Sequence, residues 1–151
     1  MVMCTFLEVL TTLSAALFSG AAIYINLVEH PARTECGVHL AVTEFRASYK
    51  KGAVFMGSLL MIGCSCAAAV WLLNSNAWWL IGASFLLIPI PYTLVFIFPI
   101  NKRLLATNLQ NGADLELNLL MRWGKLHILR SLSGLASFLI FVFLLTHNSQ
   151  K

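Results

Sequence analysis

The amino-acid sequence predicts an all-α protein: a membrane four-helix up-and-down bundle, formed by a single transmembrane domain over residues 1–151. Composition is the first observation behind this prediction. The chain is 59% hydrophobic and only 11% charged, and its mean hydropathy is +0.81. Soluble domains contain about 25% charged residues, so the solvent of this chain is lipid. Ten Lys and Arg residues cannot form a phosphate-binding face in so apolar a chain, which excludes nucleic-acid binding.

Long uncharged runs are the second observation, and they predict where the chain crosses the membrane. Residues 9–28 and 52–100 contain no charged side chain. A bilayer core takes about 20 apolar residues per helix, so the first run holds one span and the second holds two. The run 131–146 is too short, and its helix must begin before it. We expect spans at about residues 5–28, 53–73, 77–99 and 126–146.

The polar sequence at residues 74–76 predicts a tight turn between the second and third spans. Trp71, Trp78 and Trp79 flank it, as aromatic residues do at a membrane interface. Within the third span, Pro89 and Pro91 each lack a backbone donor, so we expect a kink there.

The distribution of basic residues predicts the topology. Lys and Arg gather in the connections 29–51 and 101–130, whereas the turn between the second and third spans has none. By the positive-inside rule, both connections face the cytoplasm and both termini lie on the opposite side. The alternative for the first span is a cleavable signal peptide. It is disfavoured, because Glu8 stands where such a peptide carries positive charge.

Four cysteines raise the alternative of thiol–disulfide exchange: Cys4, Cys36, Cys64 and Cys66. Such enzymes need a Cys-x-x-Cys pair. Cys64 and Cys66 are two residues apart, which points their thiols to different sides of a helix. We therefore interpret the cysteines as small apolar packing residues.

Polar residues gather at the predicted cytoplasmic end of the bundle. Glu29 and His30 precede Pro31, which we expect to end the first helix there. Pro99 is expected to end the third helix in the same way, placing Asn101 at membrane depth, where an unpaired amide is costly. Glu44 and Tyr49 fall in a stretch that is consistent with a short amphipathic helix.

The last connection leads into the most informative helix. Asn111 and Gly112 indicate a turn, and Asp114 with Glu116 is typical of a first helical turn. Further on, one face of this helix carries polar and aromatic residues at helical spacing: Glu116, Trp123, His127, Arg130 and Gly134.

This stripe has two interpretations. One is interfacial anchoring, in which Trp and Arg side chains reach the headgroups. The other is a functional site, because His30, Asn101 and His127 each stand at the same end of a different helix. Ionisable residues in such positions are functional candidates by default.

Several short motifs resemble the anthrone oxygenase-like membrane protein family, DUF1772, in order and spacing from the first span to the last. They are Gly20-Ala21-Ala22, Glu29-His30-Pro31-Ala32, residues 45–49, Pro99-Ile100-Asn101-Lys102-Arg103-Leu104 and Arg122-Trp123-x-x-x-His127-x-x-Arg130. The resemblance implies oxidation of an anthrone to an anthraquinone with O₂ and no added cofactor.

These residues suit that chemistry. An anthrone has a doubly benzylic C–H, so a base such as His127 or His30 can remove its proton. Arg130 and Asn101 can donate to the developing enolate oxygen. Trp123 offers a flat face.

Further candidates for substrate binding are Glu29, Glu44 and Tyr49. Glu29 in particular can orient a histidine. An apolar substrate can reach such a site from the bilayer.

Other interpretations stay open at this point. Two histidines with Glu29 or Glu44 can ligate iron or copper, and facing histidines can hold a haem. A non-enzymatic alternative is a small binding, helper or transport protein whose polar cluster is structural. The expected partners are the lipid bilayer, a hydrophobic small molecule and O₂. The sequence does not predict the oligomeric state.

Overall fold

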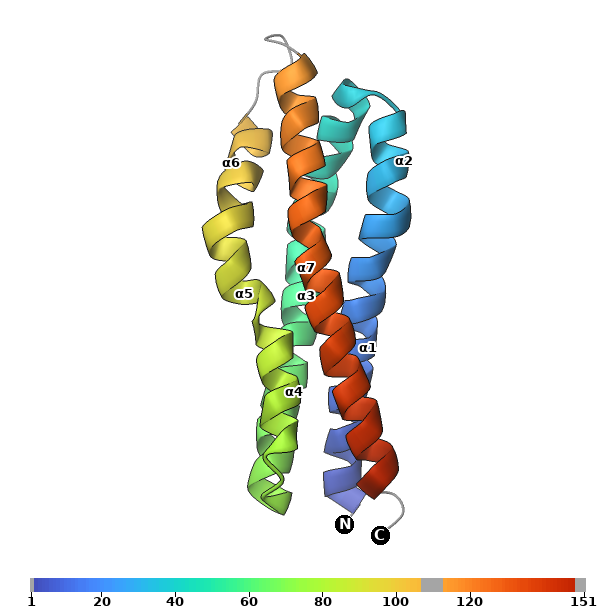
Figure 1. Ribbon diagram of the computed structural model, residues 1–151, viewed down its shortest axis with the longest axis vertical. Coiled ribbons are helices and arrows are strands. Elements are labelled where there is room, and N and C mark those ends of the chain that lie inside the picture. Colours follow the sequence, from blue (N-terminus) through green and yellow to red (C-terminus); the bar gives the residue numbers. More distant parts are fainter. Residues whose placement is uncertain (1, 107–112, 149–151) are drawn as a thin grey trace.

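Four long helices packed side by side make up the described chain, as the sequence predicts (Figure 1). The computed structural model describes residues 2–106 and 113–148, and within these ranges no strand occurs. The described residues form four helices long and apolar enough to cross a membrane. The first begins and the last ends at the same end of the bundle as the turn near residue 75. The all-α up-and-down bundle is therefore confirmed.

Each span is built from one or more helical elements. The first contains α1 (Val2–Tyr24), the π-helix η1 (Ile25–Glu29) and α2 (His30–Glu35). The second is the single helix α3 (Val38–Asn74), and the fourth is α7 (Ala113–Asn148). The third consists of α4 (Trp78–Leu87), α5 (Pro89–Tyr92), the π-helix η2 (Thr93–Ile97) and α6 (Phe98–Ala106).

Pro31 and Pro99 lie inside helices, so the prediction that they end helices is wrong. A helical proline lacks an N–H and clashes with the carbonyl four residues earlier. Each proline here follows a wide π turn that contains this carbonyl. The N–H of His30 bonds to the carbonyl of Ile25, five residues back, and the N–H of Phe98 bonds in the same way to Thr93. The wide turns absorb the prolines, and the helices continue.

Helix also replaces most of the predicted connections. Residues 29–51 are helical apart from the short turn at Cys36 and Gly37, where Gly37 has a φ of 90°. The fourth helix begins well before residue 126, as predicted, and carries Asp114 and Glu116 in its first turn. The predicted turn at Asn111 and Gly112 lies outside the described residues. The membrane boundaries and the side that faces the cytoplasm stay predictions.

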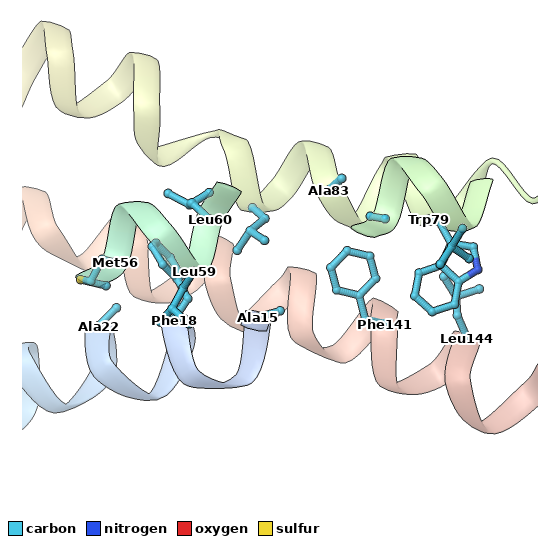
Figure 2. Packing of buried hydrophobic residues seen from close by; sticks show 13 residues of the cluster. Ala15, Phe18, Ala22, Met56, Leu59, Leu60, Trp79, Ala83, Phe141 and Leu144 are labelled. Atoms are coloured by element: carbon cyan, nitrogen blue, oxygen red, sulfur yellow. The ribbon is translucent and has the colours of Figure 1, made fainter. Parts of the chain in front are cut away.

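The turn between α3 and α4 closes through side-chain caps. Ser75 adopts a left-handed φ of 55°, and the backbone N–H of Trp78 donates to Oδ1 of Asn76 at 3.1 Å. Trp78 is exposed, consistent with an interfacial position. Trp79 is fully buried and stacks on Phe141 with 5.5 Å between ring centroids (Figure 2), so its assignment to an aromatic belt is wrong.

The third span bends near the prolines predicted to kink it. Helix α4 ends at Leu87 and α5 begins at Pro89. Beyond this break, the segment from α5 to η2 bows outward from the bundle, and α6 curves back toward α7 (Figure 1). Helix α3 packs closely on α1 and α4 but makes few contacts with the part of the third span beyond the break, from α5 to α6. The bundle is thus tight at the end with the termini and looser at the other.

In the half of the bundle near the termini, the helices approach one another closely. Small residues at the interfaces between membrane helices allow this approach. Gly82 in α4 faces the Phe141 ring of α7, and a Cβ built at Gly82 would overlap that ring. The hydroxyl of Ser137 donates to the carbonyl of Gly82 at 2.8 Å. Gly82 therefore sets the distance between α4 and α7.

We expect Gly82→Ala to lower the stability of the protein in detergent by about 1–3 kcal/mol, the usual cost of overpacking. The matched variant is Gly20→Ala, because a Cβ there meets nothing within 4 Å. Both changes gain the same helix propensity, about 1 kcal/mol, so the difference in Tm isolates the clash with Phe141. Equal Tm values for the two variants would contradict this packing.

Candidate functional site

A cavity of about 260 Å³ opens in the looser half of the bundle. This is close to the lower end of small-molecule sites, roughly 300–1,000 Å³. Its walls come from all four spans. The polar and aromatic residues that line it are Glu29, Arg33, Phe45, Ser48, Tyr49, Lys51, Asn101, Trp123, His127 and Arg130. The sequence-predicted site residues on the third and fourth spans thus meet in one place.

Stacked rings form one wall of the cavity. Trp123 lies against His127, with ring centroids 4.7 Å apart, and its edge meets Phe45 at 5.4 Å in a T-shaped contact. On its other side Trp123 contacts His30, also at 5.4 Å. Trp123 and His127 share a face of α7, as the helical spacing predicts, and both are buried.

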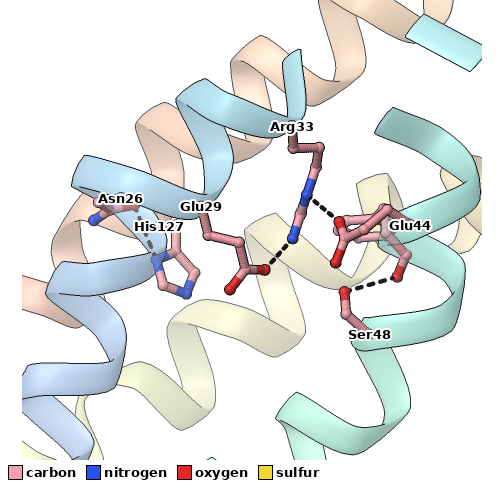
Figure 3. Close-up of polar contacts among 7 residues, drawn as sticks. Asn26, Glu29, Arg33, Glu44, Ser48 and His127 are labelled. Carbon is pink, nitrogen blue, oxygen red and sulfur yellow. Dashed lines mark hydrogen bonds and ion pairs between the residues drawn. The ribbon is translucent and has the colours of Figure 1, made fainter. Parts of the chain in front are cut away.

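His127 is held by an amide from the first span. Oδ1 of Asn26 lies 3.0 Å from Nδ1 of His127 (Figure 3), and Nδ2 of Asn26 donates to the hydroxyl of Ser131 at 2.7 Å. With its nitrogen directed at Ser131, the amide presents its oxygen to the imidazole, so Nδ1 carries the proton. Nε2 then keeps its lone pair, and it has no hydrogen-bond partner in residues 2–106 and 113–148.

A buried arginine joins two carboxylates beside the stacked rings. The Arg33 side chain is only 4% exposed and forms ion pairs with Glu29 and Glu44 (Figure 3). Its guanidinium carbon also lies 5.7 Å from the centroid of the Phe45 ring, within cation–π range. Two carboxylates therefore balance the charge of Arg33 within the protein, and these ion pairs link α2 to α3.

Arg130 has a different environment. Its Nη2 lies 3.6 Å from the sulfur of Met56, its guanidinium is 5.9 Å from the Phe18 ring centroid, and its buried Nε has no hydrogen-bond partner. Across the described chain, no carboxylate pairs with it. Asn101 is 2% exposed, and its buried Oδ1 also lacks a partner. The cavity therefore has unsatisfied polar groups on two of its walls.

Two predicted candidates do not line this cavity. His30 is buried, but it packs against α7 where a Cβ at Gly124 would meet its ring, and neither of its nitrogens has a partner in the described residues. Glu44 reaches the site only through Arg33. The roles assigned to these two residues stay predictions.

Sequence reasoning missed Asn26 and Arg33 as site residues. Asn26 is the only amide side chain in the uncharged run 9–28, and an amide at membrane depth is a signal for a buried partner. Arg33 follows Glu29 by four residues, the spacing of a helical ion pair. It was overlooked because Pro31 was expected to end the helix between them.

The possibility of a metal site was also left open by the sequence. No group of three or more His, Cys, Asp or Glu side chains lies close enough to hold an ion in the part of the chain that the structure describes. His30 and His127 each pack against the indole of Trp123, with ring centroids 5.4 Å and 4.7 Å away.

Four helices long and apolar enough to cross a membrane define a multi-pass integral membrane protein. A comparison with protein families matches residues 45–140 to the family model described as anthrone oxygenase. The match covers well over half of the chain, so the chain belongs to the anthrone oxygenase family. It includes Tyr49, Asn101, Trp123, His127 and Arg130. No curated protein and no solved structure gives a significant match.

We expect Arg33→Met to lower the free energy of unfolding in detergent by about 1–3 kcal/mol. Removing one member of a fully buried ion pair costs about 3–5 kcal/mol, and the partly exposed Glu29 and Glu44 reduce this cost by turning to water. The triple variant Glu29→Gln/Arg33→Met/Glu44→Gln removes the stranded charges and should recover part of the loss. A triple variant as unstable as Arg33→Met would show that the ion pairs do not act this way.

Proposed function

We propose that this membrane protein catalyses the O₂-dependent oxidation of an anthrone-like polycyclic substrate to a quinone, with His127 as the general base. The observation that carries the proposal is the hydrogen bond from Nδ1 of His127 to Asn26. It leaves the lone pair of Nε2 available beside an aromatic-lined cavity. Membership of the anthrone oxygenase family supports the choice of reaction.

Proton removal is the step in which the protein participates most directly. The methylene of an anthrone is doubly benzylic and conjugated with the ketone, so the electron pair left by deprotonation spreads onto the ketone oxygen. Arg130 and Asn101 line the same cavity as His127 and can donate hydrogen bonds to that oxygen. Trp123 and Phe45 add aromatic surface to the wall of the cavity, which suits an aromatic substrate.

The carbanion then reduces O₂ without a further electron donor. A C–O bond forms at the former methylene carbon, and the peroxide anion takes the proton back from His127. Removal of the second C–H proton breaks the O–O bond, which leaves a ketone and releases water. The balance is R₂CH₂ + O₂ → R₂C=O + H₂O, so the substrate supplies all the electrons that O₂ accepts.

The alternative, a non-enzymatic protein with a structural polar cluster, is favoured by one observation. Arg33, Glu29 and Glu44 satisfy one another within the protein. The histidine and asparagine next to them distinguish the two functions, because a structural cluster has no need for a directed imidazole lone pair.

We expect His127→Gln to lower kcat/KM about 10²–10⁴-fold, the usual contribution of a general base. The measurement follows O₂ consumption and quinone absorbance with emodin anthrone, above the spontaneous rate. For the wild type, turnover should fall as the pH is lowered, because a protonated imidazole has no lone pair to accept the proton.

His30→Gln is the matched control, since His30 is buried but does not line the cavity. We expect it to keep activity within a few-fold of the wild type. Full activity in a folded His127→Gln protein would refute the base assignment. A lower Tm in His127→Gln, together with no turnover above the spontaneous rate in the wild type, would favour the non-enzymatic alternative.

Asn26 is expected to act as a positioning residue. Asn26→Leu removes the acceptor of the Nδ1–H bond, so the imidazole can adopt the other tautomer. Hydrogen bonds to a group that becomes charged are worth about 1.5–3 kcal/mol, so we expect kcat to fall about 10- to 100-fold with little change in KM. Asn26→Asp keeps an acceptor and should rescue most of the activity.

Ser131→Ala provides a second comparison for Asn26. It removes the partner of Nδ2 but leaves Oδ1 facing His127, so its effect on kcat should be smaller than that of Asn26→Leu. Equal losses from the two changes, or failure of Asn26→Asp to rescue, would count against a role for Asn26 in orienting the imidazole.

A further inference from the structure

A second cavity continues the main one toward the lipid. It has a volume of about 200 Å³ and lies between α3 and the bent half of the third span. Its outer lining is apolar or small, with Ala53 and Gly57 on α3 and with Pro89, Ile90 and Leu94 opposite. All of these residues fall in the uncharged run 52–100, so this cavity opens at bilayer depth rather than toward water.

The cavity exists because the third span bends away from α3. Pro89 follows the break between α4 and α5, and beyond it the contact with α3 is sparse. Leu94 lines this cavity and is 62% exposed. A Cβ at Gly57 would meet nothing within 4 Å, so this glycine leaves space that helix packing does not use.

The two cavities share four lining residues: Tyr49, Ala53, Asn101 and Arg130. These residues therefore stand where the opening from the lipid meets the site of His127. Asn101 is nine-tenths buried, and its Oδ1 has no partner in the described residues. An unpaired amide oxygen at membrane depth is costly, which indicates that a ligand or its bound water completes it.

The charged residues where the two cavities meet favour the binding of an anion. The ionisable residues that line the main cavity include the cations Arg33, Lys51 and Arg130 but only one carboxylate, Glu29. Arg33 is already paired with Glu29 and with Glu44. Arg130 contacts the sulfur of Met56 and the ring of Phe18, and no carboxylate of the described residues pairs with it. A cation isolated from carboxylates in an apolar site is stabilised by an anionic ligand.

We propose that the site binds its aromatic ligand as an anion paired with Arg130, and that this ligand enters from the bilayer between α3 and the α5–η2 segment. The ligand class is a flat aromatic acid, because the aromatic residues Phe45, Tyr49 and Trp123 line the cavity that Arg130 also lines. The inference rests on the proposed function in that it names the charge and the entry route of the substrate at the same site.

Binding without turnover tests the charge. The protein is placed in phosphatidylcholine nanodiscs, and energy transfer from tryptophan to anthracene reports binding of two probes of matched size, anthracene-9-carboxylate and anthracene-9-methanol. We expect the carboxylate to bind at least 10-fold more tightly after correction for partition into empty nanodiscs. Arg130→Gln should remove this preference, and Arg130→Lys should keep part of it.

Unchanged binding of the alcohol probe to Arg130→Gln shows that the variant is folded. Equal affinity of the wild type for both probes would overturn the charge assignment. Displacement of the carboxylate by oleate as readily as by unlabelled aromatic acid would overturn the assignment to an aromatic ligand.

A matched pair of glycine variants tests the entry route. Gly57→Trp fills the opening, whereas Gly20→Trp places the same side chain on α1, again where a Cβ meets nothing within 4 Å. We expect at least 10-fold slower association of both probes with Gly57→Trp and an unchanged rate with Gly20→Trp, measured by stopped flow. Equal rates for the two variants would overturn the lateral route.

These binding results are separable from the proposed reaction. A protein that binds the carboxylate through Arg130 but leaves an anthrone unoxidised would retain this inference and refute the oxygenase proposal. A protein that oxidises an anthrone but shows no preference for the carboxylate would retain the oxygenase proposal and refute this inference.

Discussion

Backbone hydrogen bonding in lipid is the constraint on which the rest of this structure depends. Inside a bilayer, no water is available to an unpaired N–H or carbonyl, so the chain must remain helical from one side to the other. Pro31 and Pro99 each lack a backbone N–H and would interrupt an α-helix. The wide turns η1 and η2 keep the helix continuous, because a carbonyl in each turn accepts a hydrogen bond from the N–H five residues further along the chain. The helices therefore extend past both prolines and carry Arg33 and Asn101 into the bundle.

This continuity explains which parts of the architecture could be predicted from the sequence. The number of spans, the turn after Asn74 and the early start of the last helix follow from the length of the uncharged runs, because burial in lipid permits few charges. The helix ends at Pro31 and Pro99 were predicted wrongly, since local sequence rules describe an α-helix and contain no π turn. Trp79 was misplaced because a tryptophan near a turn suits both an interface and a core.

The site was accessible to sequence reasoning where it follows helical periodicity. Trp123, His127 and Arg130 share one face of α7, and simple spacing finds them. Arg33 was missed because Pro31 was expected to end the helix between it and Glu29. Asn26 was missed because its partners, His127 and Ser131, lie on the fourth span, and the angle at which the first span meets the fourth brings them together. That angle is set by tertiary packing, such as Phe18 against Gly134, and no local pattern encodes it. The same packing separates Arg33, whose charge is balanced internally, from Arg130, whose charge is not.

The π turn in the first span also decides where that span can change in length. A π turn contains one residue more than the α-helical turn it replaces, so it behaves as a local insertion. Deleting a single residue from Ile25–Glu29 would restore an ordinary helical turn and leave α2 in nearly the same orientation. The same deletion in the regular part of α1 would rotate everything beyond it by about 100°, the angle per residue of an α-helix, and would turn Arg33 away from the cavity wall. The wide turn is thus the segment of the first span that can lose one residue while Arg33 keeps its place.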